Sequence, residues 1–355
     1  MQILVVGNDK NIFNENSKLL ERILEYSKIV EKYFVVVPNN KSVNINKDNL
    51  HIFSFGGRNK FTQIIKLFFG TIKIFKKERF NLISVQDQYY LAFIAYLLSK
   101  KLKTGLEIQI HGFEKYYGLR KFIANIVIPR ANSIRVVSER LKKEIIEKFK
   151  ISEDKITVVP IYTKSMVLDL GIRAERKKFV FLTIGRLVKV KNIELQIRAL
   201  KKIVEKYQNI ELHIVGEGPE KNNLEKLAED LNLKNYVKFF GYQNNVEKFY
   251  QNCDVFLLTS NYEGWGLVAI EALQYKIPII MTDVGCANEI IINNENAIII
   301  PVNNLKLLEN AMIQIYEDRV LREKFSNNTQ IAVSKLLTKE QTLDLYKKSW
   351  EKAIL

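Results

Sequence analysis

The chain is poor in cysteine and proline, and it has no long hydrophobic run. Its 355 residues include two cysteines, Cys253 and Cys286, and six prolines. Two cysteines cannot supply the disulfide framework of a small secreted protein or a four-cysteine metal site. The longest apolar run, Tyr89 to Leu98, is much shorter than the ~18 residues of a membrane-spanning helix. The first residues, Met1–Gly7, carry no basic leader and are typical of a strand, so we expect a reduced, cytoplasmic protein.

The hydrophobic content and the length of the chain indicate a globular protein with two domains. Hydrophobic residues make up 47% of the chain, which excludes a disordered protein, and no repeat period recurs. Because domains commonly contain ~100–200 residues, this length predicts two domains that each bury a core of their own.

Basic residues are concentrated in the first half of the chain. The formal net charge is +16, and residues 1–165 hold 29 Lys and Arg against 15 Asp and Glu. Residues 166–355 hold the remaining 26 basic residues against 24 acidic ones. The asymmetry favours an anionic partner for the first half, such as lipid headgroups, nucleic acid or a phosphorylated substrate. A lysine-rich bias of the whole proteome is the alternative, and the sequence leaves both open.

Short apolar runs alternate with amphipathic stretches in both halves, which is the pattern of β-α-β units with parallel strands. The predicted fold is α/β, with two Rossmann-like, doubly wound parallel sheets in domains of residues 1–165 and 166–355. We expect the linker between the domains at Pro160–Lys178. The last ~30 residues are predicted to be helical, and this C-terminal helix could cross back to the first domain. Strands are predicted at residues 2–7, 34–37, 51–55, 82–86, 106–111, 134–138, 156–160, 179–185, 211–216, 237–241, 255–260, 277–282 and 297–302.

Open parallel sheets bind ligands beyond the carboxyl ends of their strands, so the residues that follow each strand are the candidates for function. After the first strand of the second half come Gly185 and Arg186, and Lys191 stands just before a helix. A glycine that admits close backbone approach, two cations and a helix N-terminus suit a diphosphate. The alternative is a glycine turn with two solvated bases.

The strongest signal is the segment Glu263-Gly264-Trp265-Gly266-Leu267, followed by Glu271 on an apolar helix. A carboxylate inside an apolar helix is costly to bury without a partner, and the vicinal hydroxyls of a ribose are natural partners. Glu263 would reach toward a sugar, and the amides of Gly264–Leu267 would face an anion. An exposed surface glutamate is the alternative for Glu271.

Two further strand ends carry weaker signals. Gly216-Glu217-Gly218-Pro219 contains only part of a dinucleotide fingerprint and is equally typical of an ordinary strand-to-helix turn. In Asp283–Glu289, Gly285 precedes a carboxylate that is expected to start a helix, where ordinary N-terminal capping is nearly as good an interpretation.

These segments, in this order, resemble the retaining glycosyltransferases of family 4. The segments are Gly185-Arg186 with Lys191-Asn192, Gly216–Pro219, the Glu263/Glu271 pair and Asp283–Glu289. The resemblance extends over the whole chain and is most specific in the second half. It implies the GT-B fold, in which two Rossmann-like domains face a central cleft: the first binds the acceptor and the second binds the nucleotide-sugar donor.

The resemblance also implies a role for each matching residue. Arg186 and Lys191 would hold the diphosphate and stabilise the departing nucleotide, and Glu271 would bind the ribose. Glu263 would contact hydroxyls of the donor sugar, and His111, at a strand end of the first half, would lie beside that sugar, although a lone histidine is more often structural. The other donor-side candidates are Gly185, Gly216, Gly218, Tyr242 (near the base), Gly264, Trp265, Gly266 and Leu267; the acceptor-side candidates are Gly7 and Asn8.

Two departures from the family pattern concern the acceptor side and the hinge. No second glycine follows Gly7, and Ile161–Lys164 stands where an Asn-Gly turn is common. The expected reaction transfers a hexose-type sugar with retention to a glycan or lipid-linked acceptor, in cell-surface polysaccharide or glycolipid synthesis. The chain has no Asp-x-Asp motif, so we expect no metal and no cofactor besides the nucleotide-diphosphate sugar as co-substrate.

The expected partners follow from this reaction and from the charge. They are the nucleotide-sugar donor, the acceptor and, as a candidate, an anionic membrane surface, which would place the protein at the inner face of the cell membrane. The segments Phe61–Lys77 and Leu119–Arg130 interleave apolar residues with cations and could lie in a lipid interface. Packing of either segment on its own sheet, with solvated lysines, is the alternative.

Three rival functions require different sequence features. A dinucleotide-dependent oxidoreductase should have a three-glycine turn after the first strand, where Gly7 stands alone. A nucleic-acid-binding protein would fit the pI of about 9.5, but no recognised binding module is present, so no nucleic acid is expected. A GT-B phosphorylase or sugar-phosphate synthase would share much of the donor site and remains the alternative.

Overall fold

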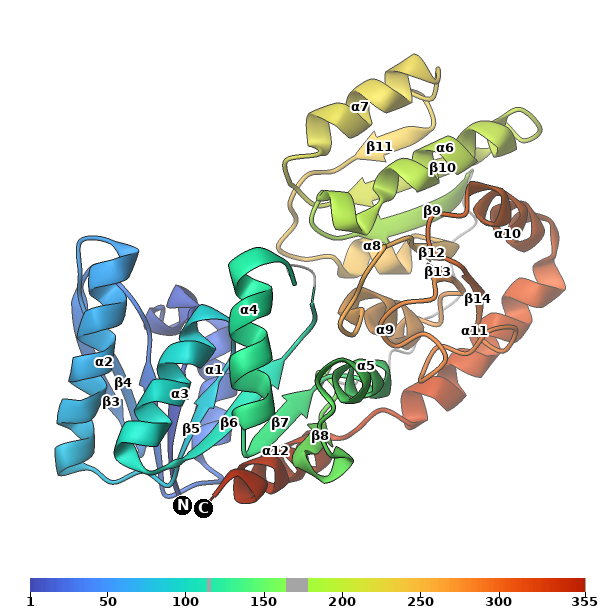
Figure 1. Cartoon of the computed structure of the whole chain (residues 1–355). Helices are drawn as coiled ribbons and strands as arrows, with labels where there is room; N and C mark the ends of the chain where they lie inside the picture. The colour runs from blue at the N-terminus through green and yellow to red at the C-terminus, as the bar shows by residue number, and fades with distance from the viewer. Residues whose placement is uncertain (114–115, 164–177, 355) are drawn as a thin grey trace. The chain divides into compact units, whose positions relative to one another are not determined.

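The computed structural model describes residues 1–113, 116–163 and 178–354, and the chain divides into two compact units (Figure 1). The first unit comprises Met1–Pro160 and Lys339–Leu355, and the second comprises Ile161–Thr338. The C-terminal helix is thus grouped with the first unit. The predicted boundary between residues 165 and 166, and most of the predicted linker, lie outside the described residues.

The first unit contains an eight-stranded sheet in the order β3-β4-β2-β1-β5-β6-β7-β8. Its central strand, β1, is apolar on both faces, and Ile3, Leu4 and Val6 are fully buried. All neighbouring pairs are parallel except β3 with β4. The strands are β1 (Gln2–Val6), β2 (Lys32–Val36), β3 (Ser42–Lys47), β4 (Leu50–Phe55), β5 (Leu82–Val85), β6 (Gly105–Ile110), β7 (Ser133–Val136) and β8 (Ile156–Val158).

The predicted strands did not include β3, which lies at the edge of the first sheet. This edge strand pairs antiparallel with β4 through a tight turn, in which Asp48 adopts a φ of 51°. Its sequence, Ser-Val-Asn-Ile-Asn-Lys, alternates exposed polar residues with half-buried ones. The only apolar residues of β3 are Val43 and Ile45, which is typical of an edge strand that faces water.

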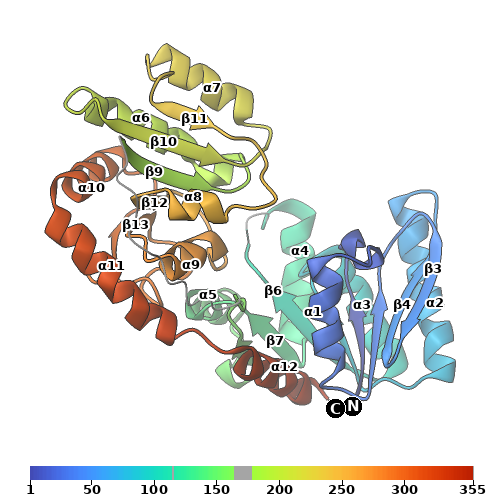
Figure 2. The same cartoon turned by 180° about the vertical axis from the view of Figure 1, so that it is seen from behind.

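Helices cover both faces of the first sheet (Figures 1 and 2). The face with α1 (Lys18–Ser27) and α12 (Lys339–Ala353) is a single apolar cluster that joins Ile3 and Val5 of β1 to Trp350 of α12. The remaining helices are α2 (Lys60–Lys77), α3 (Tyr90–Leu102), α4 (Gly118–Val127) and α5 (Glu139–Phe149). None of the helices in the described part of the chain has the length and hydropathy that a bilayer crossing requires.

A buried polar network joins α12 to the centre of the first sheet. Oε1 of Glu107, on β6, lies 3.4 Å from Nε of Arg135, on β7, and both side chains are almost fully buried. Ser84 of β5 donates a hydrogen bond to Oε2 of Glu107 at 2.5 Å, and Ser349 of α12 donates to Oε1. The Arg135 guanidinium stacks on Tyr346 of α12, with 3.6 Å between Cζ and the ring centre. The last helix therefore contributes a partner to each member of the buried ion pair.

The second unit contains a six-stranded parallel sheet in the order β11-β10-β9-β12-β13-β14. Several of its helices share one apolar core with the strands. The strands are β9 (Phe179–Ile184), β10 (Ile210–Val215), β11 (Val237–Phe239), β12 (Val255–Leu258), β13 (Ile279–Thr282) and β14 (Ala297–Ile300). The helices are α6 (Ile193–Val204), α7 (Lys221–Asp230), α8 (Glu247–Gln251), α9 (Leu267–Gln274), α10 (Leu305–Glu317) and α11 (Arg319–Ser334).

Candidate active site

The strand order of the second sheet reverses between β9 and β12, and this is the point where parallel sheets bind ligands. Two predicted site residues meet there. Nζ of Lys191, which follows β9, lies 2.5 Å from Oε1 of Glu263, which follows β12. Ser260 donates a second hydrogen bond to the same oxygen at 2.7 Å, and the amide of Asn261 donates to the carbonyl of Val190 at 2.7 Å. These hydrogen bonds join the loops after β9 and β12 and hold the Lys191 ammonium group beside the Glu263 carboxylate.

Close backbone contacts explain the glycines of the first two loops. Gly216, after β10, has a φ of +138°, and a Cβ there would lie 1.9 Å from the carbonyl oxygen of Gly185. A Cβ on Gly218 would lie 2.3 Å from the carbonyl oxygen of Leu187. Both glycines therefore let the loop after β10 pack directly against the loop that carries Arg186 and Lys191.

We expect Gly216→Ala to destabilise the second unit strongly, because the new methyl group would overlap a carbonyl and the backbone is in a region that L-residues avoid. A loss of at least ~3 kcal/mol in the free energy of unfolding is expected. Gly185→Ala is the matched control, since its Cβ would meet only Cε of Lys191, at 4.0 Å. Urea denaturation of both variants measures the difference, and equal stabilities would contradict this account.

The turn from Glu263 to Leu267 rests on the loop after β13. Gly266 precedes α9 with a φ of +90°, and the amide of Cys286 donates to the carbonyl of Trp265 at 2.8 Å. A Cβ on Gly285 would lie 2.4 Å from that same carbonyl oxygen. Gly264 is half-buried and Leu267 starts α9. The prediction that a helix starts at the carboxylate after Gly285 was wrong: Glu289 lies in a turn, because this loop packs against the backbone of Trp265.

Glu271 lies in the second turn of α9 and is half-buried. Its carboxylate accepts a hydrogen bond from the hydroxyl of Tyr250, on α8, at 2.8 Å. Desolvation, and then the nearby Glu271 charge, raise the pKa of Tyr250 well above its ordinary value, so the phenol stays protonated and donates. Sequence reasoning missed Tyr250, because a tyrosine in a short polar helix carries no signal of its own.

Two further predicted residues lie in loops but do not touch the Lys191–Glu263 pair in the structure. Arg186 is exposed after β9, and it forms no ion pair with any residue in the described ranges. Tyr242, after β11, is 71% exposed. Both side chains are therefore accessible to a ligand at the carboxyl edge of the sheet.

The first unit holds the other candidates at the carboxyl edge of its own sheet. Gly7 is buried after β1, and its amide donates to Val36 at 3.1 Å, while Asn8 is exposed. His111 follows β6; the residue is partly open to solvent, while the protein atoms packed around its imidazole still desolvate the ring. It is not next to Gly7, because β5 lies between β1 and β6.

Asp87 and Gln88, after β5, were not predicted. Gln88 donates to the carbonyl of Gly112 at 2.5 Å and ties the ends of β5 and β6 together. Asp87 caps α3 by accepting from the Leu91 amide at 2.7 Å, and desolvation raises its pKa. They lie at the strand reversal between β1 and β5, where parallel sheets bind ligands, and the sequence pattern does not display this reversal.

We expect His111 to be neutral at pH 7. Desolvation, followed by repulsion from Arg135 and Arg22, lowers the pKa of His111 below its usual 6.5. Because the unfolded chain binds this proton more tightly, the His111 contribution to stability falls as the pH drops below 6.5. NMR titration measures the pKa, and the chain has three histidines, so His111→Gln identifies the signal. A pKa at or above 6.5 would contradict the expectation.

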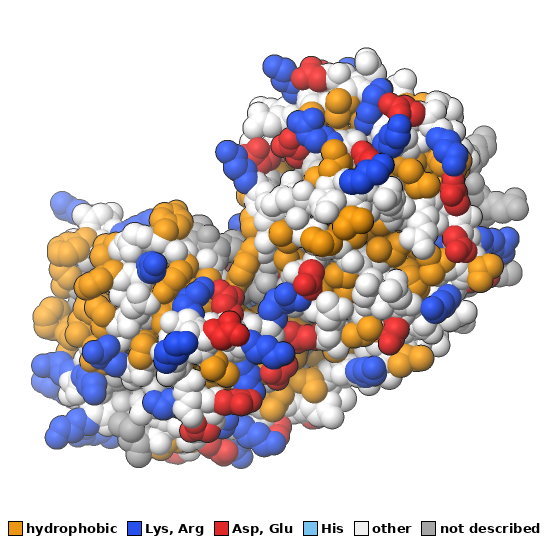
Figure 3. Space-filling model, turned by 45° about the vertical axis from the view of Figure 1, so that its right-hand side comes forward, with side chains coloured by type: hydrophobic (Ala, Val, Ile, Leu, Met, Phe, Trp, Pro, Cys, Tyr) orange, Lys and Arg blue, Asp and Glu red, His pale blue; other side chains and the backbone are white. Residues whose placement is uncertain are grey.

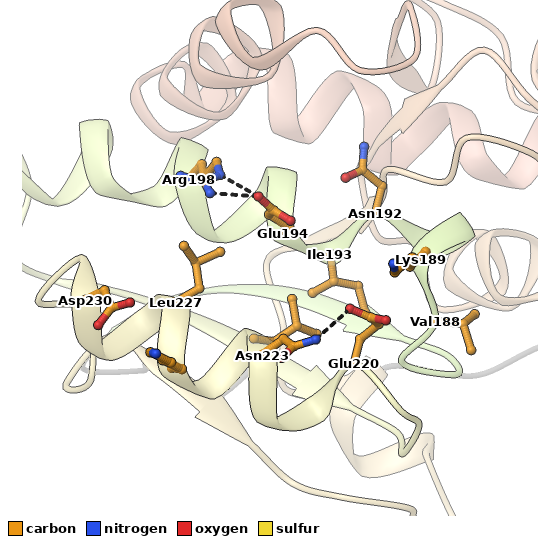
Figure 4. Close-up of a pocket in the computed structure, with 12 residues that line it drawn as sticks. Val188, Lys189, Asn192, Ile193, Glu194, Arg198, Glu220, Asn223, Leu227 and Asp230 are labelled. Atoms are coloured by element: carbon orange, nitrogen blue, oxygen red, sulfur yellow. Dashed lines mark hydrogen bonds and ion pairs between the residues drawn. The ribbon is translucent and has the colours of Figure 1, made fainter.

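A pocket of about 520 Å³ lies between α6 and α7 in the second unit and borders the loop that contains Lys189 and Asn192 (Figure 4). It is lined by pairs such as Arg198 with Glu194 and Asn223 with Glu220. None of the predicted site residues lines it. Within the described ranges, no group of three or more His, Cys, Asp or Glu side chains is placed to hold a metal ion.

Two family comparisons match this arrangement. Residues 171–331 match the family described as glycosyl transferases group 1, and residues 32–161 match glycosyltransferase family 4. The chain is a group 1 glycosyltransferase. The glycosyltransferase is 28% identical over 343 residues to an uncharacterized glycosyltransferase of Methanocaldococcus jannaschii, an alignment that covers 81% of this chain and 84% of the relative.

A second relative has a more specific name. It is the N-acetylgalactosamine-N,N'-diacetylbacillosaminyl-diphospho-undecaprenol 4-alpha-N-acetylgalactosaminyltransferase of Campylobacter jejuni, 30% identical over 222 residues, which cover 60% of this glycosyltransferase and 58% of the relative. Among solved structures, sucrose-phosphate synthase from Thermosynechococcus elongatus matches with a TM-score of 0.81 at 17% identity, over 99% of each chain. Anabaena HepE in complex with UDP and glucose matches with a TM-score of 0.76 at 16% identity, over 99% of each chain. These structural likenesses confirm the predicted GT-B fold of two Rossmann-like units.

Proposed function

We propose that this glycosyltransferase moves a hexose-type sugar, with retention of configuration, from a nucleotide-diphosphate sugar to a glycan or lipid-linked acceptor. The pairing of Lys191 with Glu263 at the strand reversal of the second sheet carries the proposal. This pair would offer a cation to a diphosphate and a carboxylate to sugar hydroxyls, at the edge where nucleotides bind to parallel sheets.

The proposed mechanism follows from the charges that develop during transfer. Breaking the bond between the anomeric carbon and the phosphate leaves positive charge on the sugar and negative charge on the diphosphate. Lys191 and Arg186 would stabilise the leaving diphosphate more in the transition state than in the ground state. Since two cations of the chain supply this charge, the proposal includes no metal.

The nucleoside would be held by α8 and α9. Glu271 offers two carboxylate oxygens to the ribose hydroxyls, and the Tyr250 hydroxyl fixes the orientation of that carboxylate. Glu263 would then contact the donor sugar. Because Glu263 already accepts hydrogen bonds from Lys191 and Ser260, its carboxylate would stay in place when the donor arrives.

The names of two related proteins support the proposed class of acceptor. The Campylobacter relative is named for a diphospho-undecaprenol acceptor, and a Staphylococcus aureus relative, 28% identical over 242 residues, is named as a capsular polysaccharide biosynthesis glycosyltransferase. We propose cell-surface polysaccharide or glycolipid synthesis on the cytoplasmic side of the membrane.

A panel of UDP- and GDP-sugars tests the donor half of the proposal. A ligand at ~100 times its dissociation constant should stabilise the fold by ~2.7 kcal/mol, which a thermal shift detects. Incubation of the best donor with a lipid-linked glycan or with a sugar phosphate separates transfer to glycans from sugar-phosphate synthesis, and NMR of the product reports the anomeric configuration. Failure of every nucleotide sugar to stabilise the protein would overturn the proposal.

A further inference from the structure

Large exposed apolar side chains gather on one group of helices in the first unit. On α2, Phe61, Ile65 and Phe69 are 72%, 39% and 65% exposed, and their spacing of four residues places them on a single face of the helix. At the start of α4, the exposed residues are Tyr117, Leu119 and Phe122. We call these six residues the apolar patch. The helix α3 packs against both α2 and α4, so the two parts of the patch lie on helices that share α3 as a neighbour.

The same three helices carry no acidic residue. They contain nine Lys and Arg, five in α2, two in α3 and two in α4, and no Asp or Glu. The other α-helices of the first unit, α1, α5 and α12, contain ten basic and eight acidic residues. A lysine-rich proteome would add lysine to all six helices, but it would not remove the acids from three adjacent ones. Figure 3 shows hydrophobic side chains beside Lys and Arg on this part of the molecule.

We propose that α2, α3 and α4 form a surface that docks on an anionic lipid bilayer. Apolar and aromatic side chains with interleaved cations are the features of helices that lie in a membrane interface. Each Lys or Arg near an anionic surface adds to the attraction, and no acidic residue of these helices opposes it. The apolar patch enters the interface while the lysines contact headgroups.

The chemistry of this surface argues against two other partners, a second copy of the chain and single-stranded nucleic acid. A second copy of the chain would bring nine cations against nine cations in a symmetric interface, which is repulsive. Single-stranded nucleic acid is held by stacked aromatic rings in a basic groove, and although four patch residues are aromatic, the aliphatic side chains of Ile65 and Leu119 among them offer neither stacking nor hydrogen bonds. A bilayer satisfies the apolar and the cationic groups together.

The surface lies near the predicted acceptor side of the first unit. The helices α2, α3 and α4 follow β4, β5 and β6, so each begins next to the carboxyl edge of the sheet, where His111 is found. Docking through Phe61 and Tyr117 would therefore bring lipid-borne acceptors to that edge. This last step rests on the proposed function, whereas lipid binding itself does not require it.

Vesicle cosedimentation of the full chain tests the proposal, with phosphatidylcholine vesicles that contain or lack phosphatidylglycerol. We expect binding to the anionic vesicles only, weakened by added salt. Reversing the exposed residues Lys66 and Lys73 together to glutamate should weaken binding by ~10-fold or more. The matched control reverses Lys143 and Lys226, which are exposed and lie outside the three helices, and it should bind nearly as well as the native chain.

A second set of variants tests the contribution of the apolar patch to lipid binding. Phe61→Ser with Phe69→Ser should reduce binding by ~10-fold or more, while Val320→Ser with Ile331→Ser, which removes exposed apolar side chains from α11, should not. In a Phe69→Trp variant, brominated lipids should quench the new fluorescence. Equal binding to neutral vesicles, equal effects of the control variants, tighter binding to single-stranded RNA than to vesicles, or self-association through the patch would each overturn the proposal. Nucleotide-sugar binding by the same variants should be unchanged, so failure here is distinguishable from failure of the proposed function.

Discussion

Replacing Lys191 by alanine is expected to lower kcat by ~10²–10³-fold, the scale of losing one donor that stabilises a developing anion. The ammonium group lies at the strand reversal of the second sheet, 2.5 Å from Glu263, and its charge would offset that of the leaving diphosphate. Arg186→Ala should have an effect of the same order. Steady-state rates with the donor found in the nucleotide-sugar panel measure both.

Lys189→Ala is the control for Lys191→Ala. Lys189 lies two residues away in the same short 3-10 helix, Lys189–Lys191, and it is exposed. Its removal changes the net charge equally but should change kcat by less than ~3-fold, because an exposed charge is screened by water and salt. A similar loss in both variants would show that general electrostatics, rather than the position of Lys191, controls the rate.

The second large effect is expected at the buried ion pair under α12. Replacing Glu107 by leucine leaves the Arg135 charge buried without its carboxylate, and so should lower the free energy of unfolding by ~3–5 kcal/mol. Arg135→Met should cost a similar amount. Urea denaturation followed by tryptophan fluorescence is suitable, since Trp350 is fully buried in α12.

The double variant, Glu107→Leu with Arg135→Met, distinguishes the ion pair from simple loss of packing. Replacing both members by apolar residues removes the uncompensated charge, so most of the lost stability should return. Additive losses in the double variant would contradict the explanation. Such a result would mean that the serines and Tyr346 around the pair, rather than the charges, hold α12 in place.

Much of the fold was predictable because its signals are local. Continuous apolar runs identified thirteen of the strands near their observed positions, and the order of strands and helices fixed the fold class. The exception, β3, alternates polar with apolar residues at an edge, where burial is too slight to leave a continuous apolar run. The glycine loops of the candidate site carry a local signal for a related reason: Gly216 and Gly218 directly follow a strand, although the backbone contacts that require them appear only in the folded unit.

Other parts of the site could not be predicted from residue patterns. Tyr250 meets Glu271 because α8 and α9 pack together, and no spacing within either helix indicates it. Asp87 and Gln88 acquire their position from the reversal of strand order between β1 and β5, which only the assembled sheet displays.

The sequence alone determined the charge asymmetry and the alternation of strands and helices. Charges can be counted along the chain, and the periodicity of a strand or helix is a property of a few neighbouring residues. The tertiary structure decided that α12 packs on the first sheet, and that Phe61 and Phe69 of α2 point to solvent. An amphipathic pattern shows that a helix has two unlike faces. Which partner each side chain meets depends on contacts between residues far apart in the chain, and these form only when the whole unit packs.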